Sequence, residues 1–159
     1  MVAPAPIPYC GLPPEPVEIW SRWVLEPALL AVLLLVPAAV LHAGRQCASS
    51  IARSAFMAGW AVVAIALVSP LCALSVALFS MRATQHMLLL VVAAPLVAYA
   101  LPQLLPGAAN RISNVLSRPA LAGIPALLFA VLLWGWHLPA PYEATFRSDL
   151  LYWAMHVSL

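Results

Sequence analysis

Four long apolar blocks, separated by short polar segments, dominate the pattern of this chain. A helix needs about 20 residues, at a rise of 1.5 Å each, to cross a hydrocarbon core about 30 Å thick. By that measure the blocks predict membrane-spanning helices at about residues 24–43, 54–79, 83–101 and 120–136. Another apolar run begins at about Leu150 and stops at Leu159. We therefore predict an all-α protein, a polytopic transmembrane helix bundle with four full spans plus the start of a fifth.

Proline adds detail to this pattern. Ser69-Pro70 is expected to kink or end the second span, because proline breaks the helical hydrogen-bond ladder. Pro95 lies inside the third span, where neighbouring helices can satisfy the carbonyl that it frees. Residues 1–22 are rich in proline and lack the basic start and apolar core of a signal peptide. We expect them to form an extended outer tail, followed by a single transmembrane domain over residues 23–159.

Composition supports the membrane class. Hydrophobic residues make up 65% of the chain and charged residues only 8%, with a mean hydropathy of +1.00. A soluble domain carries about 25% charged residues, so this chain has too few to cover a surface that faces water. The net charge of +2 does not favour nucleic acid as a partner, which leaves membrane lipid as the expected surroundings.

The charged residues predict an orientation. Acidic residues accumulate in the N-terminal tail and in the loop after the fourth span. Paired arginines occupy the other two loops, with Arg45 and Arg53 in one and Arg111 and Arg118 in the other. Under the positive-inside rule the arginine loops face the cytoplasm. The N-terminus and the acidic loop are therefore predicted to lie outside.

Three histidines share the predicted outer side. His86 lies near the outer end of the third span, His137 caps the fourth, and His156 lies on the unfinished fifth helix. Facing side chains in a helix bundle often build metal sites. Imidazole combined with thioether suits copper. Met87 lies next to His86 and Met155 next to His156, and either methionine is expected to be an additional soft ligand. The pattern predicts a copper site made by His86, His137 and His156.

Other interpretations of the same residues remain open. Histidines near a membrane surface can simply anchor helix ends, and His42, alone at the cytoplasmic end, is interpreted in that way. One alternative is a haem-binding membrane redox protein with His86 and His137 as axial ligands. The other is a structural membrane scaffold that holds no metal. Arg82 is interpreted as an interfacial anchor, and Gln85 as a hydrogen-bond partner for a ligating imidazole.

No catalytic constellation accompanies the histidines. The chain has no serine–histidine–acid set, no phosphate-binding loop and no pair of carboxylates within its apolar blocks. Hydrolysis and phosphoryl transfer therefore have no support, and we predict that the protein is not an enzyme.

Several motifs resemble one known family. They are Ser69-Pro70-Leu71, Phe79-Ser80, Gln85-His86-Met87-Leu88-Leu89, Ala94-Pro95-Leu96 and Trp136-His137-Leu138-Pro139, followed by Tyr142, Ala144 and His156. Together they are similar to the multi-span CtaG family, assembly factors for caa-type cytochrome c oxidases. The resemblance implies a multi-pass protein of the bacterial inner membrane that acts as a chaperone. Such a protein holds or delivers copper at the outer face, for a cytochrome c oxidase subunit, without catalysis.

Carried over to this chain, the family's histidine positions match His86, His137 and His156. Two positions depart from the family pattern, because Arg82 and Tyr152 stand where relatives often have histidine. Relatives also usually have further spans after the point where this chain stops. We therefore expect a truncated member of the family or a fragment, with a reduced set of metal ligands.

Overall fold

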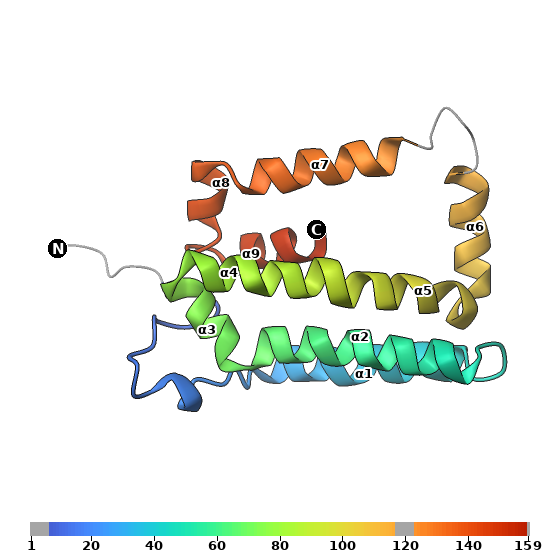
Figure 1. Ribbon diagram of the computed structural model, residues 1–159, viewed down its shortest axis with the longest axis horizontal. Helices are drawn as coiled ribbons and strands as arrows, with labels where there is room; N and C mark the ends of the chain where they lie inside the picture. The colour runs from blue at the N-terminus through green and yellow to red at the C-terminus, as the bar shows by residue number, and fades with distance from the viewer. Residues whose placement is uncertain (1–6, 117–122, 159) are drawn as a thin grey trace. The chain divides into compact units, whose positions relative to one another are not determined.

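The computed structural model describes residues 7–116 and 123–158, and every regular element in that part of the chain is helical (Figure 1). The prediction of an all-α protein is confirmed. A short 3-10 turn, η1, and a π-helical segment, η2, accompany nine α-helices among the described residues. The elements are η1 (Ile19–Ser21), α1 (Pro27–Ala43), α2 (Ser50–Val68), α3 (Pro70–Ala77), α4 (Phe79–Met87), η2 (Leu88–Ala93), α5 (Ala94–Leu104), α6 (Pro106–Leu116), α7 (Ile124–Trp136), α8 (Pro139–Ala144) and α9 (Asp149–Ser158).

The chain divides into two compact units. The central unit, Pro13–Asn114, contains α1 to α5 and most of α6. The terminal unit joins the N-terminal segment, up to Leu12, to the chain from Val115 onward. Sequence alone predicted a single domain over residues 23–159, and it gave no sign that the first residues group with the last helices.

Two helical stretches are long and apolar enough to cross a membrane. They are Ser50–Val68, with 19 residues, and Phe79–Leu104, with 26 residues. The helices α1 and α7 are also apolar, but they have only 17 and 13 residues. Four full spans are therefore not reached among the described helices. Residues 120–122 of the predicted fourth span lie outside the described part of the chain.

The boundary at Ser69-Pro70 appears where it was expected. The helix α2 ends at Val68 and α3 begins at Pro70, so the predicted span 54–79 is wrong in its second half. Ser69 caps α3 by accepting a hydrogen bond from the backbone N–H of Leu71 at 3.3 Å. Proline suits the first helical turn because its missing N–H would have no partner there.

The predicted third span, 83–101, is part of a longer run of α4, η2 and α5. Pro95 is the second residue of α5, two positions after the π-helical segment ends at Ala93. Proline has no N–H to donate to the carbonyl four residues earlier, and π segments are a known way for a helix to absorb such a break. The restart expected near Leu150 is confirmed as α9.

Small residues let α2 and the η2–α5 helix approach closely. Along α2, Ala52, Gly59 and Ala66 recur every seven residues and are buried, as are Ala93 and Ala100 on the opposing helix. A Cβ added at Gly59 would lie 3.0 Å from the backbone oxygen of Ala93. Close backbone packing through small residues is typical of helices that associate in a membrane.

A hydrophobic cluster continues this contact toward one end of the central unit. It consists of Ala48, Ala52, Phe56, Ala100 and Leu104. Trp60 stacks on Phe56, with ring centroids 5.9 Å apart. The cluster fixes the end of α5 against the loop that joins α1 to α2.

A proline inside α1 leaves one backbone carbonyl without its helical donor, and a side chain from another helix supplies the hydrogen bond. Pro37 lies inside α1 and has no N–H to donate to the carbonyl of Leu33, four residues earlier. The indole Nε1–H of Trp60 donates to that carbonyl from α2 at 2.8 Å. A backbone carbonyl left without a partner away from water costs free energy, so this bond both satisfies the Leu33 carbonyl and joins α1 to α2.

The same arrangement recurs at the end of α2. The carbonyl of Ala66 lies in the last turn, and the residue four positions later is Pro70, which has no N–H. The side-chain Nε2–H of Gln85 donates to Ala66 from α4 at 2.9 Å, in a fully buried setting. Gln85 thereby fixes α4 against the end of α2.

The terminal unit is held mainly by rings. Tyr9 stacks on Tyr152 of α9, with centroids 4.9 Å apart, and meets the edge of Trp153 at 5.0 Å. The Sγ atom of Cys10 lies 3.4 Å from the hydroxyl of Tyr152. The expectation of an extended tail over residues 1–22 is therefore wrong at Tyr9 and Cys10, because aromatic stacking binds this segment to α9.

Candidate functional site

His156 lies on α9, with its ring orientation fixed by its own helix. Its Nδ1 lies 2.9 Å from the carbonyl oxygen of Tyr152, four residues earlier. The imidazole also stacks on the ring of Tyr152, with centroids 4.2 Å apart and planes tilted by 38°. Its other nitrogen, Nε2, is a buried atom.

His137 has a closely similar arrangement at the end of α7. It is the C-cap residue of that helix, and its side chain is exposed. Its Nδ1 lies 2.6 Å from the carbonyl oxygen of Leu133, again four residues earlier. Both imidazoles are thus oriented by the last turn of the helix that carries them.

These two bonds define the tautomer of each ring. A carbonyl oxygen can only accept a hydrogen bond, so Nδ1 must carry the hydrogen in both His137 and His156. In the neutral imidazole, Nε2 then holds the lone pair that can coordinate a metal ion. Histidines that bind metals commonly have this second hydrogen bond, which fixes the ring and makes the ligand more basic.

A side-chain hydrogen bond brings the ends of α7 and α9 together. The indole Nε1–H of Trp136 donates to the hydroxyl of Ser158 at 2.9 Å. Trp136 directly precedes His137, and Ser158 follows His156 by two residues. Two of the three predicted ligands therefore belong to neighbouring helix ends in the terminal unit.

His86 belongs to the central unit, on α4. It is half-buried, and its Nε2 is a buried atom. Gln85 was expected to accept a hydrogen bond from the N–H of this imidazole, which stays a prediction; its own amide Nε2–H donates to the carbonyl oxygen of Ala66.

No group of three or more histidine, cysteine, aspartate or glutamate side chains is arranged to hold a metal ion among the residues that the structure describes. His137 and His156 share the terminal unit, and His86 lies in the central unit. The convergence of all three histidines stays a prediction.

The neighbouring methionines do not share the direction of the histidines. Successive residues on a helix point about 100° apart, so Met87 and Met155 face away from His86 and His156. Met155 is buried at 1% exposure as a packing residue, and Met87 is 53% exposed. The expected role of Met87 and Met155 as additional thioether ligands stays a prediction.

Arg82 also differs from expectation. An interfacial anchor should reach into water, but Arg82 is only 5% exposed. It lies on α4 four residues before His86, at a position where the motif resemblance implied a histidine. The guanidinium of Arg82 is therefore buried and does not act as an anchor in water.

The role of Tyr9 could not be found from the sequence. Nothing in the proline-rich segment indicates that its tyrosine stacks on Tyr152, which lies far away in the chain. The spacing of Tyr152 and His156 was a usable signal, since residues four apart on a helix share a face. The ring contact between these two residues confirms that shared face.

These features define a class: an all-helical protein with apolar helices long enough for membrane association and with oriented imidazoles at two helix ends. The chain matches the cytochrome c oxidase caa3 assembly factor family (Caa3_CtaG) over residues 29–159, and it belongs to that family. No curated protein and no solved structure matches the chain significantly.

Family membership confirms the resemblance seen in the motifs. It assigns the chain to cytochrome c oxidase assembly and implies association with the oxidase. Assembly factors of this kind are generally not catalytic.

Proposed function

We propose that this protein is a multi-pass membrane protein of the bacterial inner membrane that takes up copper at the outer face and passes it to an oxidase subunit. His137 and His156 supply Nε2 as ligands, and His86 completes the set. Copper is the cargo, so binding must be reversible. An open set of three imidazoles suits release better than a closed tetrahedral site.

One observation carries this proposal. Both histidines of the terminal unit use Nδ1 for a backbone carbonyl, so Nε2 is the ring nitrogen that carries the lone pair a metal needs. An imidazole that merely anchors a helix end needs no fixed tautomer. The same fixed geometry at two neighbouring helix ends favours a role as ligands.

Tyr152 has a part in this site although it is not a histidine. Its carbonyl oxygen orients His156 and its ring covers one face of the imidazole. At this position, where the motif resemblance implied a histidine, the chain has a tyrosine whose ring packs on His156.

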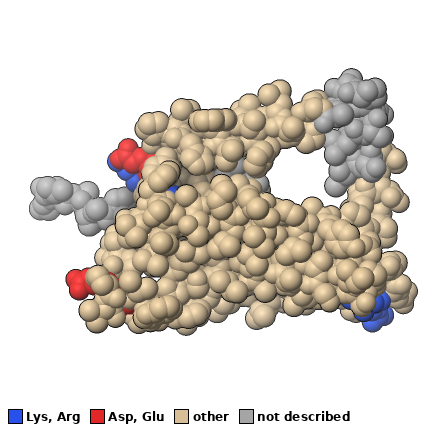
Figure 2. All heavy atoms as spheres, viewed as in Figure 1, with Lys and Arg blue, Asp and Glu red and all other residues tan. Residues whose placement is uncertain are grey.

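Charge within the central unit supports the proposed orientation. Figure 2 shows acidic side chains at one end of this unit and basic side chains at the other. Arg45 and Arg53 lie at the α1–α2 junction, which we assign to the cytoplasmic side. The N-terminus is then outside, together with the end of α4 that carries His86.

Copper titration of the purified protein tests the proposal. The variants His86→Ala, His137→Ala and His156→Ala are each expected to weaken copper binding by more than about tenfold, since losing even an outer partner of a ligand costs 10–100-fold. His42→Ala is the matched control, because His42 is exposed at the opposite end of the central unit and should not affect binding. Unchanged affinity in all three variants would remove the site.

A labelling experiment tests the orientation separately. Cys47 is free and exposed in the loop between α1 and α2. A thiol reagent that cannot cross the membrane should label it only after the cytoplasmic side is opened. Cys47→Ser should abolish that signal, and labelling of intact cells at Cys47 would invert the proposed topology.

A further inference from the structure

The arginines of this chain are in two different electrostatic situations. The chain contains no aspartate or glutamate between Pro27 and Tyr142, but it contains five arginines there: Arg45, Arg53, Arg82, Arg111 and Arg118. Arg118 lies outside the described residues and Arg82 is buried. The other three are exposed in the central unit.

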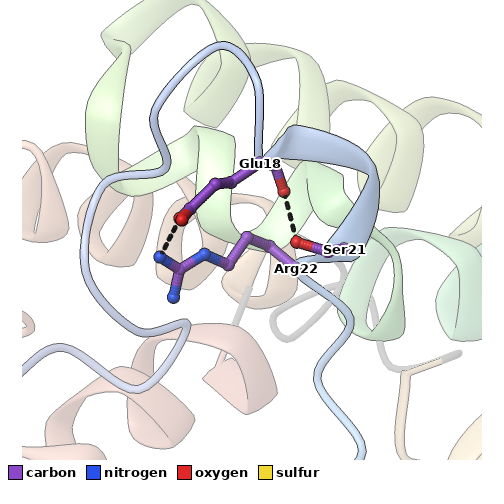
Figure 3. A network of polar contacts seen from close by, with 3 residues as sticks. All are labelled: Glu18, Ser21 and Arg22. Carbon is purple, nitrogen blue, oxygen red and sulfur yellow. Dashed lines mark hydrogen bonds and ion pairs between the residues drawn. The ribbon is translucent and has the colours of Figure 1, made fainter.

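Outside this stretch, arginine has a carboxylate partner in its own helical turn. Arg22 donates to the carboxylate of Glu18, four residues earlier, and Ser21 donates to the backbone oxygen of the same glutamate (Figure 3). Arg147 pairs in the same way with Glu143. Both of these arginines are neutralised within the protein.

The loop that carries the exposed Arg45 is packed against the end of α5. Gly44 lies so close to Leu104 that an added Cβ would be 2.8 Å from the Leu104 Cα atom. The hydroxyl of Ser49 donates to Oε1 of Gln103 at 3.0 Å. The loop with Arg45 is therefore fixed against the end of α5.

Arg53 extends this surface along the first turn of α2. Its Nη2 and Nε donate to the carbonyl oxygen of Ala48, at 2.9 and 3.3 Å. The guanidinium is thus held over the loop, with its remaining N–H groups available to an acceptor outside the protein. Arg111 follows on α6, directly beyond the end of α5.

We propose that Arg45, Arg53 and Arg111 bind the headgroups of anionic phospholipids in the cytoplasmic leaflet. We call these three residues the basic end. The inference rests on the membrane placement proposed above. Among described residues the basic end has no ion pair, so its counterions must come from outside the protein. Anionic headgroups lie at the level where apolar helices end, and they attract arginines near the surface.

The structure favours lipid over free phosphate as the source of the anion. The three arginines lie at or next to the ends of the apolar helices α1, α2 and α5. A lipid satisfies both features, since its phosphate meets the guanidinium groups while its chains cover the apolar helices. A free phosphate ion would use only the charges.

Native mass spectrometry of the full chain tests this inference. The protein is released from mixed micelles that contain equal amounts of phosphatidylglycerol and phosphatidylcholine, and the retained lipids are counted. Wild-type protein is expected to retain mainly phosphatidylglycerol. In the variant Arg45→Gln/Arg111→Gln, the ratio of bound phosphatidylglycerol to bound phosphatidylcholine should fall by about fivefold or more for each arginine removed. The charge-preserving variant Arg45→Lys/Arg111→Lys should keep most of this ratio.

A matched control keeps the test specific. Arg22→Gln/Arg147→Gln removes the same number of charges from arginines that already have carboxylate partners. Its lipid preference should equal that of the wild type. If both glutamine variants lose the same share of the lipid preference, the preference depends only on total charge and the proposal is overturned. An unchanged preference in Arg45→Gln/Arg111→Gln would also overturn it.

Two further measurements separate this inference from neighbouring ones. Complete displacement of phosphatidylglycerol by millimolar inorganic phosphate would show an ion site and overturn the lipid assignment. Copper binding should be the same in Arg45→Gln/Arg111→Gln and in the wild type. A protein that binds no copper would therefore still be expected to prefer phosphatidylglycerol. A protein that stays soluble without detergent would contradict the membrane placement, and with it the lipid proposal.

Discussion

The central and terminal units of this protein are stabilised in different ways. In the central unit, α2 buries five residues against its neighbours, and two proline-freed carbonyls receive side-chain donors from other helices. In the terminal unit, α7 has no buried residue, and the described contacts are mostly ring stacking and single hydrogen bonds. The terminal unit carries the two imidazoles that are oriented by backbone carbonyls, and these are two of the ligands of the proposed copper site.

Glycine substitutions should give the largest difference between the units. Gly44→Ala and Gly59→Ala introduce a Cβ 2.8 Å from the Cα atom of Leu104 and 3.0 Å from the backbone oxygen of Ala93, respectively. Each should destabilise the protein by about 1–3 kcal/mol through overpacking, with Gly44→Ala the more severe. Thermal unfolding in detergent measures the effect.

Gly135→Ala is the control for this pair. Gly135 lies in α7 of the terminal unit, and an added Cβ there meets no atom within 4 Å. Alanine also favours helix over glycine, so stability should stay the same or rise slightly. Equal destabilisation by all three substitutions would contradict the contrast between the units.

Gln85→Leu should have the next largest effect. It leaves the carbonyl of Ala66 buried without its donor, which costs about 1–3 kcal/mol. Gln85→Glu should be similarly destabilising, because a carboxylate has no N–H to donate. Hydrogen exchange at the end of α2 and in α4 should rise in both variants, and unchanged protection would show that Gln85 does not join these helices.

Trp60→Phe should be milder. It keeps most of the ring but removes the N–H that reaches the Leu33 carbonyl, a loss of about 0.5–1.5 kcal/mol. Trp134→Phe is the matched control, since Trp134 is 75% exposed. If both variants unfold at the same temperature as the wild type, the hydrogen bond from Trp60 to the Leu33 carbonyl contributes nothing to stability.

Trp136→Phe should change global stability least, but it tests most directly how the terminal unit differs from the central unit. It removes the bond to Ser158 that joins the ends of α7 and α9, at a cost of about 0.5–1.5 kcal/mol confined to the terminal unit. Copper affinity should fall although every histidine remains. A copper affinity equal to the wild type would mean that His137 and His156 need no such alignment.

The sequence predicted the helices better than their contacts. Apolar length and Ser69-Pro70 were enough to find α1, α2, α7 and the restart at α9, because these are local signals. The contact of Tyr9 with α9 was invisible, since stacking between distant segments leaves no periodic pattern.

Gln85 shows what more could have been inferred. Proline at position 70 predicts a freed carbonyl at Ala66, and a polar side chain at similar depth on the next helix is a natural donor. The sequence instead suggested a role beside His86, because adjacency in the chain is easier to see than adjacency between helices. For the histidines, only the structure showed that Nδ1 is occupied in His137 and His156.

X-ray absorption spectroscopy of the copper-loaded protein tests most directly whether His137 and His156 coordinate copper through Nε2. Wild-type protein should show at least two imidazole ligands, and the variant His137→Ala/His156→Ala should lose that imidazole scattering while His42→Ala keeps it. An unchanged imidazole count in His137→Ala/His156→Ala would place copper elsewhere and contradict the proposed site.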